Sequence, residues 1–221
     1  MTPVSEARVV NDDGQRIPVI GQDRTILGDV YRDEVNLAVW QREVPEAVTD
    51  YLRSELVARQ EFKVAMMVSA VNAREALAQA IGAGEDNALV SDVVDLIEMF
   101  CCLFDIEREG LRLTTLSRAM CPKFHVDHLP CRLVTTYQGV GSEWIPEARV
   151  NRSRLLTGDD GSYDTAKPYS DEEDIEQLSA GDVAILKGSG WLGNEHAGIV
   201  HRSPAVEAGE NRLLMTLDFA N

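Results

Sequence analysis

The strongest constraint on the fold is a change in the character of the sequence near Gly110. Before this point, apolar residues recur at helical spacing, as in Val48, Leu52 and Leu56. After it, short β-rich segments are separated by glycine and proline. Helices followed by many short strands indicate an α+β protein in which helices pack outside a β-sandwich or barrel. The predicted strands of this half are 111–118, 123–127, 132–137, 182–187, 198–202 and 212–219.

The first 110 residues predict mainly helices. One helix is expected after Pro45, a second from residue 72 or 73 to Gly82, and a third, apolar nearly all round and therefore buried, at 92–105. Residues 35–40 predict a strand, and residues 64–71 could be a strand or a helix. A chain of 221 residues is expected to form one domain. We expect residues 1–110 to be a mainly helical support region for a β core at 111–221.

Charge and cysteine usage limit the partners and the compartment. The chain has 21 basic and 37 acidic residues, a net charge of −16. Such a chain repels nucleic-acid phosphates and anionic lipid, so neither is an expected partner. No apolar stretch reaches the roughly 18 residues of a membrane span. The polar start of the sequence and the placement of Cys101 and Cys102 in an apolar run favour the reducing cytoplasm. The oligomeric state is left open.

The four histidines are the most informative side chains. His125, His128, His196 and His201 fall in two short clusters within the β-rich half, and none precedes residue 125. Imidazole is the commonest transition-metal ligand in proteins. On a strand, residues two apart share a face, so His125 and Asp127 are expected to converge. A histidine from the second cluster would complete a set of two imidazoles and one carboxylate, as in non-haem Fe(II) oxygenases.

The second cluster carries a family resemblance. In His201–Arg212, a histidine is followed by Pro204, by Val206, by a Gly209 turn and then by Arg212. This resembles the distal segment of Fe(II)/2-oxoglutarate-dependent oxygenases, especially the prolyl-hydroxylase-like group. Upstream, the segments 124–127, 132–137 and 139–143 resemble the His-x-Asp strand, the next strand and the Gly-rich turn of that group. The resemblance covers about residues 110–219.

The resemblance implies a fold and a ligand set. It implies a double-stranded β-helix (jelly roll) in the C-terminal half, with Fe(II) held by His125, Asp127 and His201. It also implies that Arg212 grips a carboxylate of 2-oxoglutarate, as a guanidinium can do bidentately. Arg132 could serve instead, or could pair with Asp127 or Glu143.

Other side chains are weaker candidates for the same site. Tyr137 could hydrogen-bond 2-oxoglutarate, although a core tyrosine is the simpler interpretation. Trp144 and Trp191 could wall a substrate pocket or pack at a barrel mouth. Asn194 and His196 lie just ahead of the distal histidine and are candidate substrate contacts, with His196 also a competitor for the third metal position. His128 is interpreted as a turn residue before Pro130.

Three functions follow. The first is an Fe(II)- and 2-oxoglutarate-dependent hydroxylase acting on a small molecule or a protein side chain. The whole pattern is also similar to an uncharacterised bacterial domain-of-unknown-function family whose members accompany zinc-homeostasis proteins. The second function is therefore non-catalytic binding of zinc or another divalent metal, linked to metal homeostasis. The third is a cupin-like metalloenzyme that does not use 2-oxoglutarate, in which Arg212 binds a substrate carboxylate directly.

Overall fold

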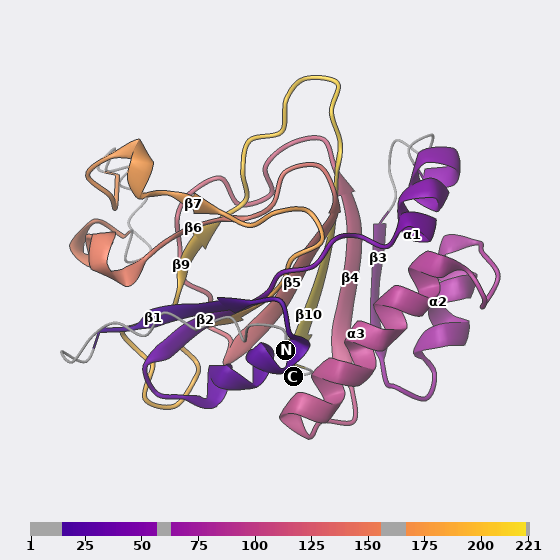
Figure 1. Ribbon diagram of the computed structural model, residues 1–221, viewed down its shortest axis with the longest axis horizontal. Helices are drawn as coiled ribbons and strands as arrows, with labels where there is room; N and C mark the ends of the chain where they lie inside the picture. Colours follow the sequence, from indigo (N-terminus) through magenta and orange to yellow (C-terminus); the bar gives the residue numbers. More distant parts are fainter. Residues whose placement is uncertain (1–14, 57–62, 156–166, 220–221) are drawn as a thin grey trace, which may run out of the picture.

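The strands form two sheets of unequal size in a mixed α+β architecture (Figure 1). The computed structural model describes residues 15–56, 63–155 and 167–219. The large sheet has seven strands in the order β1-β2-β8-β5-β10-β4-β3, and the small sheet has the order β7-β6-β9. The strands are β1 (Ile17–Gly21), β2 (Val35–Trp40), β3 (Lys63–Val68), β4 (Glu109–Leu116), β5 (Cys131–Gln138), β6 (Glu143–Ile145), β7 (Glu176–Gln177), β8 (Val183–Lys187), β9 (Val200–Arg202) and β10 (Arg212–Phe219).

Three α-helices lie together at one end of the molecule, beside β3 and β4, with the small sheet at the other end (Figure 1). They are α1 (Glu46–Tyr51), α2 (Ala73–Ile81) and α3 (Ala88–Phe104), and a 3₁₀ helix, η1 (Arg24–Tyr31), joins β1 to β2. The Asn87 side chain caps α3 by accepting from the backbone N–H of Leu89 and Val90. Gly82 ends α2 with a φ of 69°, which glycine adopts without steric cost. Within the described residues, no helix is both long and apolar enough to cross a membrane.

Alternation along the strands gives the large sheet two apolar faces. On β10, Leu213, Met215 and Leu217 belong to the core that includes the buried residues of α2 and α3. Leu214, between them in sequence, belongs to a second core shared with Trp144 of the small sheet. One face of the large sheet therefore packs on helices and the other faces the small sheet.

From residue 109 onward, the chain passes repeatedly from one sheet to the other. β4, β5, β8 and β10 belong to the large sheet, whereas β6, β7 and β9 belong to the small one. Between β4 and β5, His125 forms an isolated antiparallel bridge with His201 of β9 and so joins the small sheet. Because of this winding, the two sheets face each other, and side chains from both point into the space between them.

Some elements agree with the sequence expectation and others differ from it. The strands at 35–40 and 212–219 and the helices near 73–81 and 92–105 are confirmed. The segment 123–127, however, forms one bridge rather than a strand. The first 110 residues also supply three strands of the large sheet, since β1 pairs with β2, β2 with β8 and β3 with β4. Of these, β1 was not expected from the sequence. Residue 110 lies within β4, so it does not mark a boundary in the large sheet. N-terminal strands form both edges of that sheet, β1 at one edge and β3 at the other.

Candidate metal centre

The backbone pairing of His125 with His201 places their side chains together. Each residue donates its backbone N–H to the carbonyl of the other at 3.0 Å. Because this pairing directs both imidazoles to the same face, the ring centroids lie 4.5 Å apart. The neighbours Phe124 and Val200 face the opposite way, into a separate apolar cluster on the outside of the small sheet. This is the alternation that the sequence predicts around His125.

Asp127 completes a set of three candidate ligands. Its Oδ1 lies 3.6 Å from Nε2 of His125, and its Oδ2 lies 3.7 Å from Nε2 of His201. One ligand atom from each of the three residues lies within 4.8 Å of the other two, and no other group of three or more His, Cys, Asp or Glu in the described parts of the chain meets this condition. Asp127 Oδ2 is buried and accepts no hydrogen bond from the described residues. Arg132 NH1 lies 2.9 Å from this oxygen as an ion-pair partner but makes no hydrogen bond to it, so the oxygen keeps a lone pair that fits a metal ligand.

The tautomers of the two histidines also fit metal binding. Nδ1 of His125 lies 2.9 Å from the carbonyl of Lys123, and Nδ1 of His201 lies 3.2 Å from the carbonyl of Ile199. A carbonyl only accepts hydrogen bonds, so in each ring Nδ1 carries the hydrogen. When a ring is neutral, its lone pair is therefore on Nε2, the nitrogen that faces Asp127. A hydrogen bond to the far nitrogen imposes this orientation on metal-binding histidines.

Burial and charge set the protonation of the three groups. Burial raises the pKa of Asp127, but its hydrogen bond with His125 and the positive fields of His201 and Arg132 outweigh this and lower the pKa to about 2. Burial lowers the pKa of His201 to about 4. The hydrogen bond to Asp127 raises the pKa of His125 above its ordinary value of 6.5. At neutral pH, Asp127 is therefore an anion and His201 is neutral, as ligation requires.

A neighbouring turn fixes the backbone that carries Asp127. Ser189 donates its backbone N–H to the Asp127 carbonyl at 2.8 Å, and Gly188 donates to Pro130 at 2.9 Å. A Cβ added at Gly188 would lie 2.2 Å from the Leu129 carbonyl oxygen and 2.6 Å from that of Asp127. Only glycine permits this approach, so the end of β8 holds the Asp127 segment in place.

Arg212 is the largest of the fully buried side chains. Its guanidinium donates to three hydroxyls: NH1 to Ser203 Oγ at 3.1 Å, and NH2 to Thr136 Oγ1 at 3.1 Å and Ser142 Oγ at 2.8 Å. Its Nε has no partner in the described part of the chain, and burial lowers the pKa of Arg212 to about 10. The carboxylate whose field acts on it, Glu143, is bonded to Arg202 instead. A buried cation held by hydroxyls alone fits an anionic ligand.

Arg212 shares one cavity with two of the three candidate metal ligands, His125 and His201. The cavity measures about 150 Å³. Its floor includes Val134, Leu186 and Leu214, which belong to the core between the sheets. The lining residues are Arg112, Thr114, Met120, Cys121, His125, Arg132, Val134, Ser142, Leu186, His201, Arg202, Ser203, Arg212, Leu214 and Thr216. His125, His201 and Arg212 therefore meet in one cavity. Asp127 is not among the lining residues, but one of its oxygens lies within 4.8 Å of a ligand atom of each histidine.

Arg132, the alternative clamp, is already engaged. Its Nε and NH2 donate to the two oxygens of Asp218 at 2.6 and 3.1 Å. Its NH1 lies 2.9 Å from Oδ2 of Asp127. Arg132 thus pairs with Asp127, which was the other possibility open from the sequence, and it supports a candidate ligand rather than offering a free guanidinium.

The structure does not bring Tyr137 to the cavity. Tyr137 packs in the core on the helix side of β5 and donates its hydroxyl to Asp92 at 2.6 Å. Thr136, one residue earlier, faces the cavity instead and bonds Arg212. The prediction that Tyr137 contacts 2-oxoglutarate is therefore corrected by the alternation of faces along a strand.

The remaining substrate candidates lie away from the cavity lining. Trp191 contacts Tyr31 and Phe104 edge-on in the helix-side core. Asn194 is buried and bonds the Gly188 carbonyl through its side chain, which is a structural role. Trp144 is buried in the core between the sheets, rather than at a barrel mouth, and is not among the residues that line the cavity.

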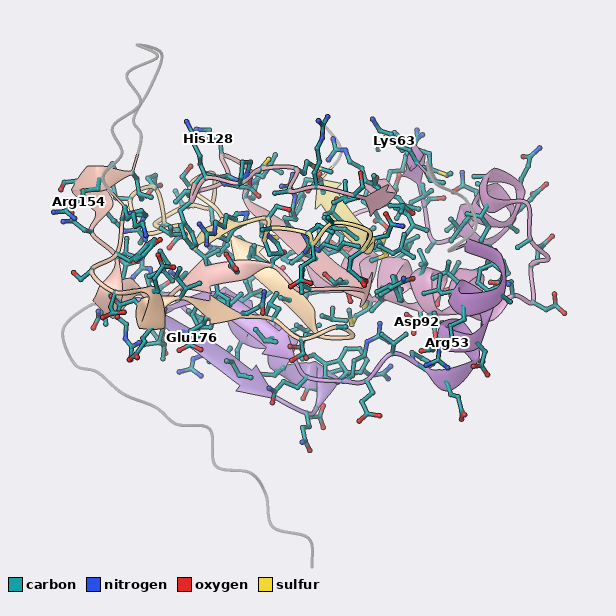
Figure 2. The ribbon with its side chains drawn as sticks, turned by 90° about the horizontal axis from the view of Figure 1, so that it is seen from above. Arg53, Lys63, Asp92, His128, Arg154 and Glu176 are labelled. Carbon is teal, nitrogen blue, oxygen red and sulfur yellow. The ribbon has the colours of Figure 1, made fainter. Side chains whose placement is uncertain are left out.

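The two other histidines do not belong to the group of three candidate ligands. His196 is exposed and does not line the cavity. His128 is exposed too, and it lies at the edge of the molecule in Figure 2.

Sequence reasoning missed the hydroxyl cage of Arg212 and the acidic partner of Arg132. Thr136, Ser142 and Ser203 come from three separate segments, and nothing in their spacing marks them as a set. Asp218 could have been found, because it shares the alternating face of β10 with Arg212.

A two-sheet fold with two imidazoles and a carboxylate converging beside a buried arginine defines a protein with a candidate mononuclear metal centre. The chain belongs to the family described as "Protein of unknown function (DUF1826)", whose model matches residues 21–218. This family membership agrees with the resemblance to a domain of unknown function seen in the sequence. Among curated proteins, none matches this sequence.

Several solved structures are similar at low identity. Dioxygenase for auxin oxidation 1 from Arabidopsis thaliana, in its 2-oxoglutarate complex, is 11% identical with a TM-score of 0.48, over 94% of this chain and 93% of that one. A Pseudomonas putida prolyl-4-hydroxylase is 13% identical (TM-score 0.41; 89% and 98% covered). HygX from Streptomyces hygroscopicus with iron bound is 15% identical (TM-score 0.43; 88% and 85% covered). All three TM-scores lie below 0.5, so we base the proposal below on this chain's own residues.

Proposed function

We propose that this protein is a non-haem Fe(II)- and 2-oxoglutarate-dependent oxygenase that hydroxylates its substrate. One observation carries the proposal. A fully buried guanidinium, held by three hydroxyls and paired with no carboxylate in its hydrogen bonds, shares a cavity with the two histidines of a His-Asp-His set. A divalent metal would satisfy the His-Asp-His set, and a small dianion bound to that metal would satisfy the guanidinium.

The fold supports the same proposal. We assign residues 109–219 to a double-stranded β-helix, because the chain alternates between two facing sheets as that fold requires. β9 and the His125 bridge place two candidate ligands on the small sheet, while Arg212 opens β10 on the large sheet. The helices α2 and α3 then support the outer face of the large sheet.

Each residue has a role that follows from its contacts. His125, Asp127 and His201 would hold Fe(II), and Arg212 would bind the far carboxylate of 2-oxoglutarate. When bound, iron and 2-oxoglutarate supply the activation of O₂ and the oxidising equivalents for hydroxylation of a C–H bond. The hydroxyls of Ser203, Ser142 and Thr136 fix the guanidinium. Val134, Leu186 and Leu214 supply an apolar wall that excludes water.

An anaerobic titration tests the proposal. Protein loaded with Fe(II) under argon is titrated with 2-oxoglutarate, and the weak visible charge-transfer band of the chelate is recorded. We expect a saturable band for the wild type and for Arg24→Ala, which removes an exposed arginine of η1. Arg212→Ala should need at least about tenfold more 2-oxoglutarate, since a charge-assisted bidentate contact contributes roughly 1.5–3 kcal/mol.

Two other results would each support a different function. Tight zinc retention from iron-replete medium, with no 2-oxoglutarate binding by calorimetry, would favour the non-catalytic metal-binding role. Iron binding that leaves 2-oxoglutarate without effect would favour a cupin-like enzyme in which Arg212 binds a substrate carboxylate. Either outcome would overturn the oxygenase proposal.

A further inference from the structure

The cavity is cationic in a strongly acidic protein. Four arginines line it (Arg112, Arg132, Arg202 and Arg212), and no aspartate or glutamate is among its lining residues. The whole chain, in contrast, carries a net charge of −16. An isolated cationic cavity on an anionic molecule concentrates small anions and repels cations.

Part of this charge is already balanced. Three carboxylates pair with the lining arginines: Asp218 with Arg112 and Arg132, Asp127 also with Arg132, and Glu143 with Arg202. Four guanidinium groups against three carboxylates leave one positive charge. If the proposed function holds, a divalent metal and a dianionic 2-oxoglutarate cancel each other, so the surplus of one positive charge remains for the substrate.

Arg112 is the arginine with donors to spare. Arg132 uses all three of its nitrogens on carboxylates, and Arg202 pairs with Glu143 while its guanidinium lies 4.3 Å from the centroid of the Phe124 ring. Arg112 bonds only through NH1, to Asp218, among the described residues. Its side chain is 56% exposed, so the group sits at the mouth of the cavity and can accept a ligand from solvent.

Thr216 lies beside Arg112 and offers a second polar group. The two residues face each other in the register of β10 and β4, and both line the cavity. The Thr216 hydroxyl is buried and has no hydrogen-bond partner in the described part of the chain. A buried hydroxyl without a partner costs free energy unless a ligand satisfies it.

We propose that Arg112 and Thr216 form a substrate subsite that binds the carboxylate of a small organic acid. This subsite is separate from the Arg212 clamp, since each has its own strand position and its own partners. Asp218 bonds both Arg112 and Arg132, so its single negative charge is shared between two guanidinium groups. That the bound acid is the substrate rests on the proposed oxygenase function. That Arg112 and Thr216 bind an anion rests on these residues alone.

Cys121 provides a reporter inside the cavity. It is exposed and lines the cavity, whereas the second exposed cysteine, Cys102, lies on α3 outside it. Cys101 and Cys131 are buried. Iodoacetate carries a carboxylate and iodoacetamide carries a neutral amide of nearly the same size. The ratio of their alkylation rates at each cysteine, read by peptide mass, therefore measures the local preference for an anion.

The experiment uses Fe(II)-loaded protein under argon with saturating 2-oxoglutarate. We expect a higher iodoacetate-to-iodoacetamide ratio at Cys121 than at Cys102. Arg112→Gln should lower the ratio at Cys121 by about threefold or more, because one nearby charge is lost. Arg112→Lys should restore most of it, and Arg24→Gln should leave it unchanged. An unchanged Cys102 rate and unreactive Cys101 and Cys131 confirm that each variant is folded.

A ratio at Cys121 no higher than at Cys102, or one that Arg112→Gln does not lower, would overturn the subsite. The visible 2-oxoglutarate band, recorded on the same samples, reports separately on the proposed function. A missing band with an Arg112-dependent ratio would reject the oxygenase and keep the anion subsite. A normal band with an Arg112-independent ratio would keep the oxygenase and reject the anion subsite.

Discussion

Single residues at the candidate centre differ in ways that their types do not predict. His125 and His201 are both imidazoles that bond a carbonyl two residues earlier. Burial lowers the pKa of His201 to about 4, whereas the hydrogen bond to Asp127 raises the pKa of His125. His201 is thus prepared as a neutral ligand over the physiological range, and His125 must lose a proton before it can bind a metal.

The first prediction concerns ligand identity. His201→Ala should lower the affinity for Fe(II) or Zn(II) by roughly 100-fold or more, because ligand loss should cost at least as much as the loss of an outer partner. His128→Ala is the matched control, since His128 is exposed and bonds only Ser189 among the described residues. Competition with a chelator of known affinity measures both variants. Equal metal affinity in His201→Ala and in the wild type would contradict the assignment.

The second prediction concerns pH. Metal binding displaces a proton wherever a ligand is protonated in the free protein. Because the pKa of His125 is raised above 6.5, affinity should fall about tenfold per pH unit as the pH drops through that pKa. Asp127 and His201, with pKa values of about 2 and about 4, should add nothing above pH 5. Calorimetry in buffers of different ionisation enthalpy should show about one proton released per metal at pH 6. Release of two protons would contradict the assigned protonation states.

At the scale of elements, a short turn after β8 fixes the backbone that carries the candidate ligand Asp127. The backbone N–H groups of Gly188, Ser189 and Gly190 donate to the carbonyls of Pro130, Asp127 and Leu129. The segment that carries Asp127 is therefore positioned by a loop that contributes no candidate ligand. This dependence is typical of sites that are precise although their ligands lie outside long strands.

The third prediction follows from that contact. Gly188→Ala should push the Asp127 backbone away, since the new Cβ would meet two carbonyl oxygens within 2.6 Å. We expect metal affinity to fall by about tenfold or more, in the range known for loss of supporting contacts. Gly28→Ala is the control, because a Cβ there would meet nothing within 4 Å. Unchanged metal affinity in a folded Gly188→Ala protein would show that the loop contact does not position Asp127.

A buried acid at the start of β4 gives the fourth prediction. Glu109 is fully buried, accepts a hydrogen bond from the Cys101 thiol, and burial raises its pKa to about 7. The folded protein then binds a proton more tightly than the unfolded chain, so stability should decrease as the pH rises from about 4.5 to 7 and level off above that.

Glu109→Gln should remove this pH dependence. On going from pH 5 to pH 8, the free energy of unfolding of the variant should rise by about 1–3 kcal/mol relative to that of the wild type. Urea unfolding at the two pH values measures this change. Glu98→Gln, an exposed site on α3, should leave the difference between the two pH values unchanged. A wild-type stability that rises over this interval in step with the Glu109→Gln variant would contradict the account.

How much of the structure could be predicted from the sequence depends on element length. The strand at 35–40, the helix α3 and the alternating strand β10 carry enough residues to show their period. Strands β6, β7 and β9 have three, two and three residues, so only their context defines them. The shared face of His125 and Asp127 was predictable, whereas the hydroxyl cage of Arg212 depends on three segments that only the fold brings together.

At the scale of the whole molecule, charge is divided between surface and cavity. In Figure 2, Arg154 lies at one end of the molecule and the helices form the other end. From the net charge of −16 we expect no nucleic-acid partner, whereas from the four lining arginines we expect the cavity to bind small anions.

The most direct test of the central claim is a crystal structure of the anaerobic complex with Fe(II) and 2-oxoglutarate, using anomalous diffraction at the iron edge. We predict one iron peak bound by Nε2 of His125, Nε2 of His201 and a carboxylate oxygen of Asp127. We also predict 2-oxoglutarate with its far carboxylate on Arg212. An iron peak away from these three side chains, or a 2-oxoglutarate that leaves Arg212 bonded to hydroxyls alone, would contradict the account.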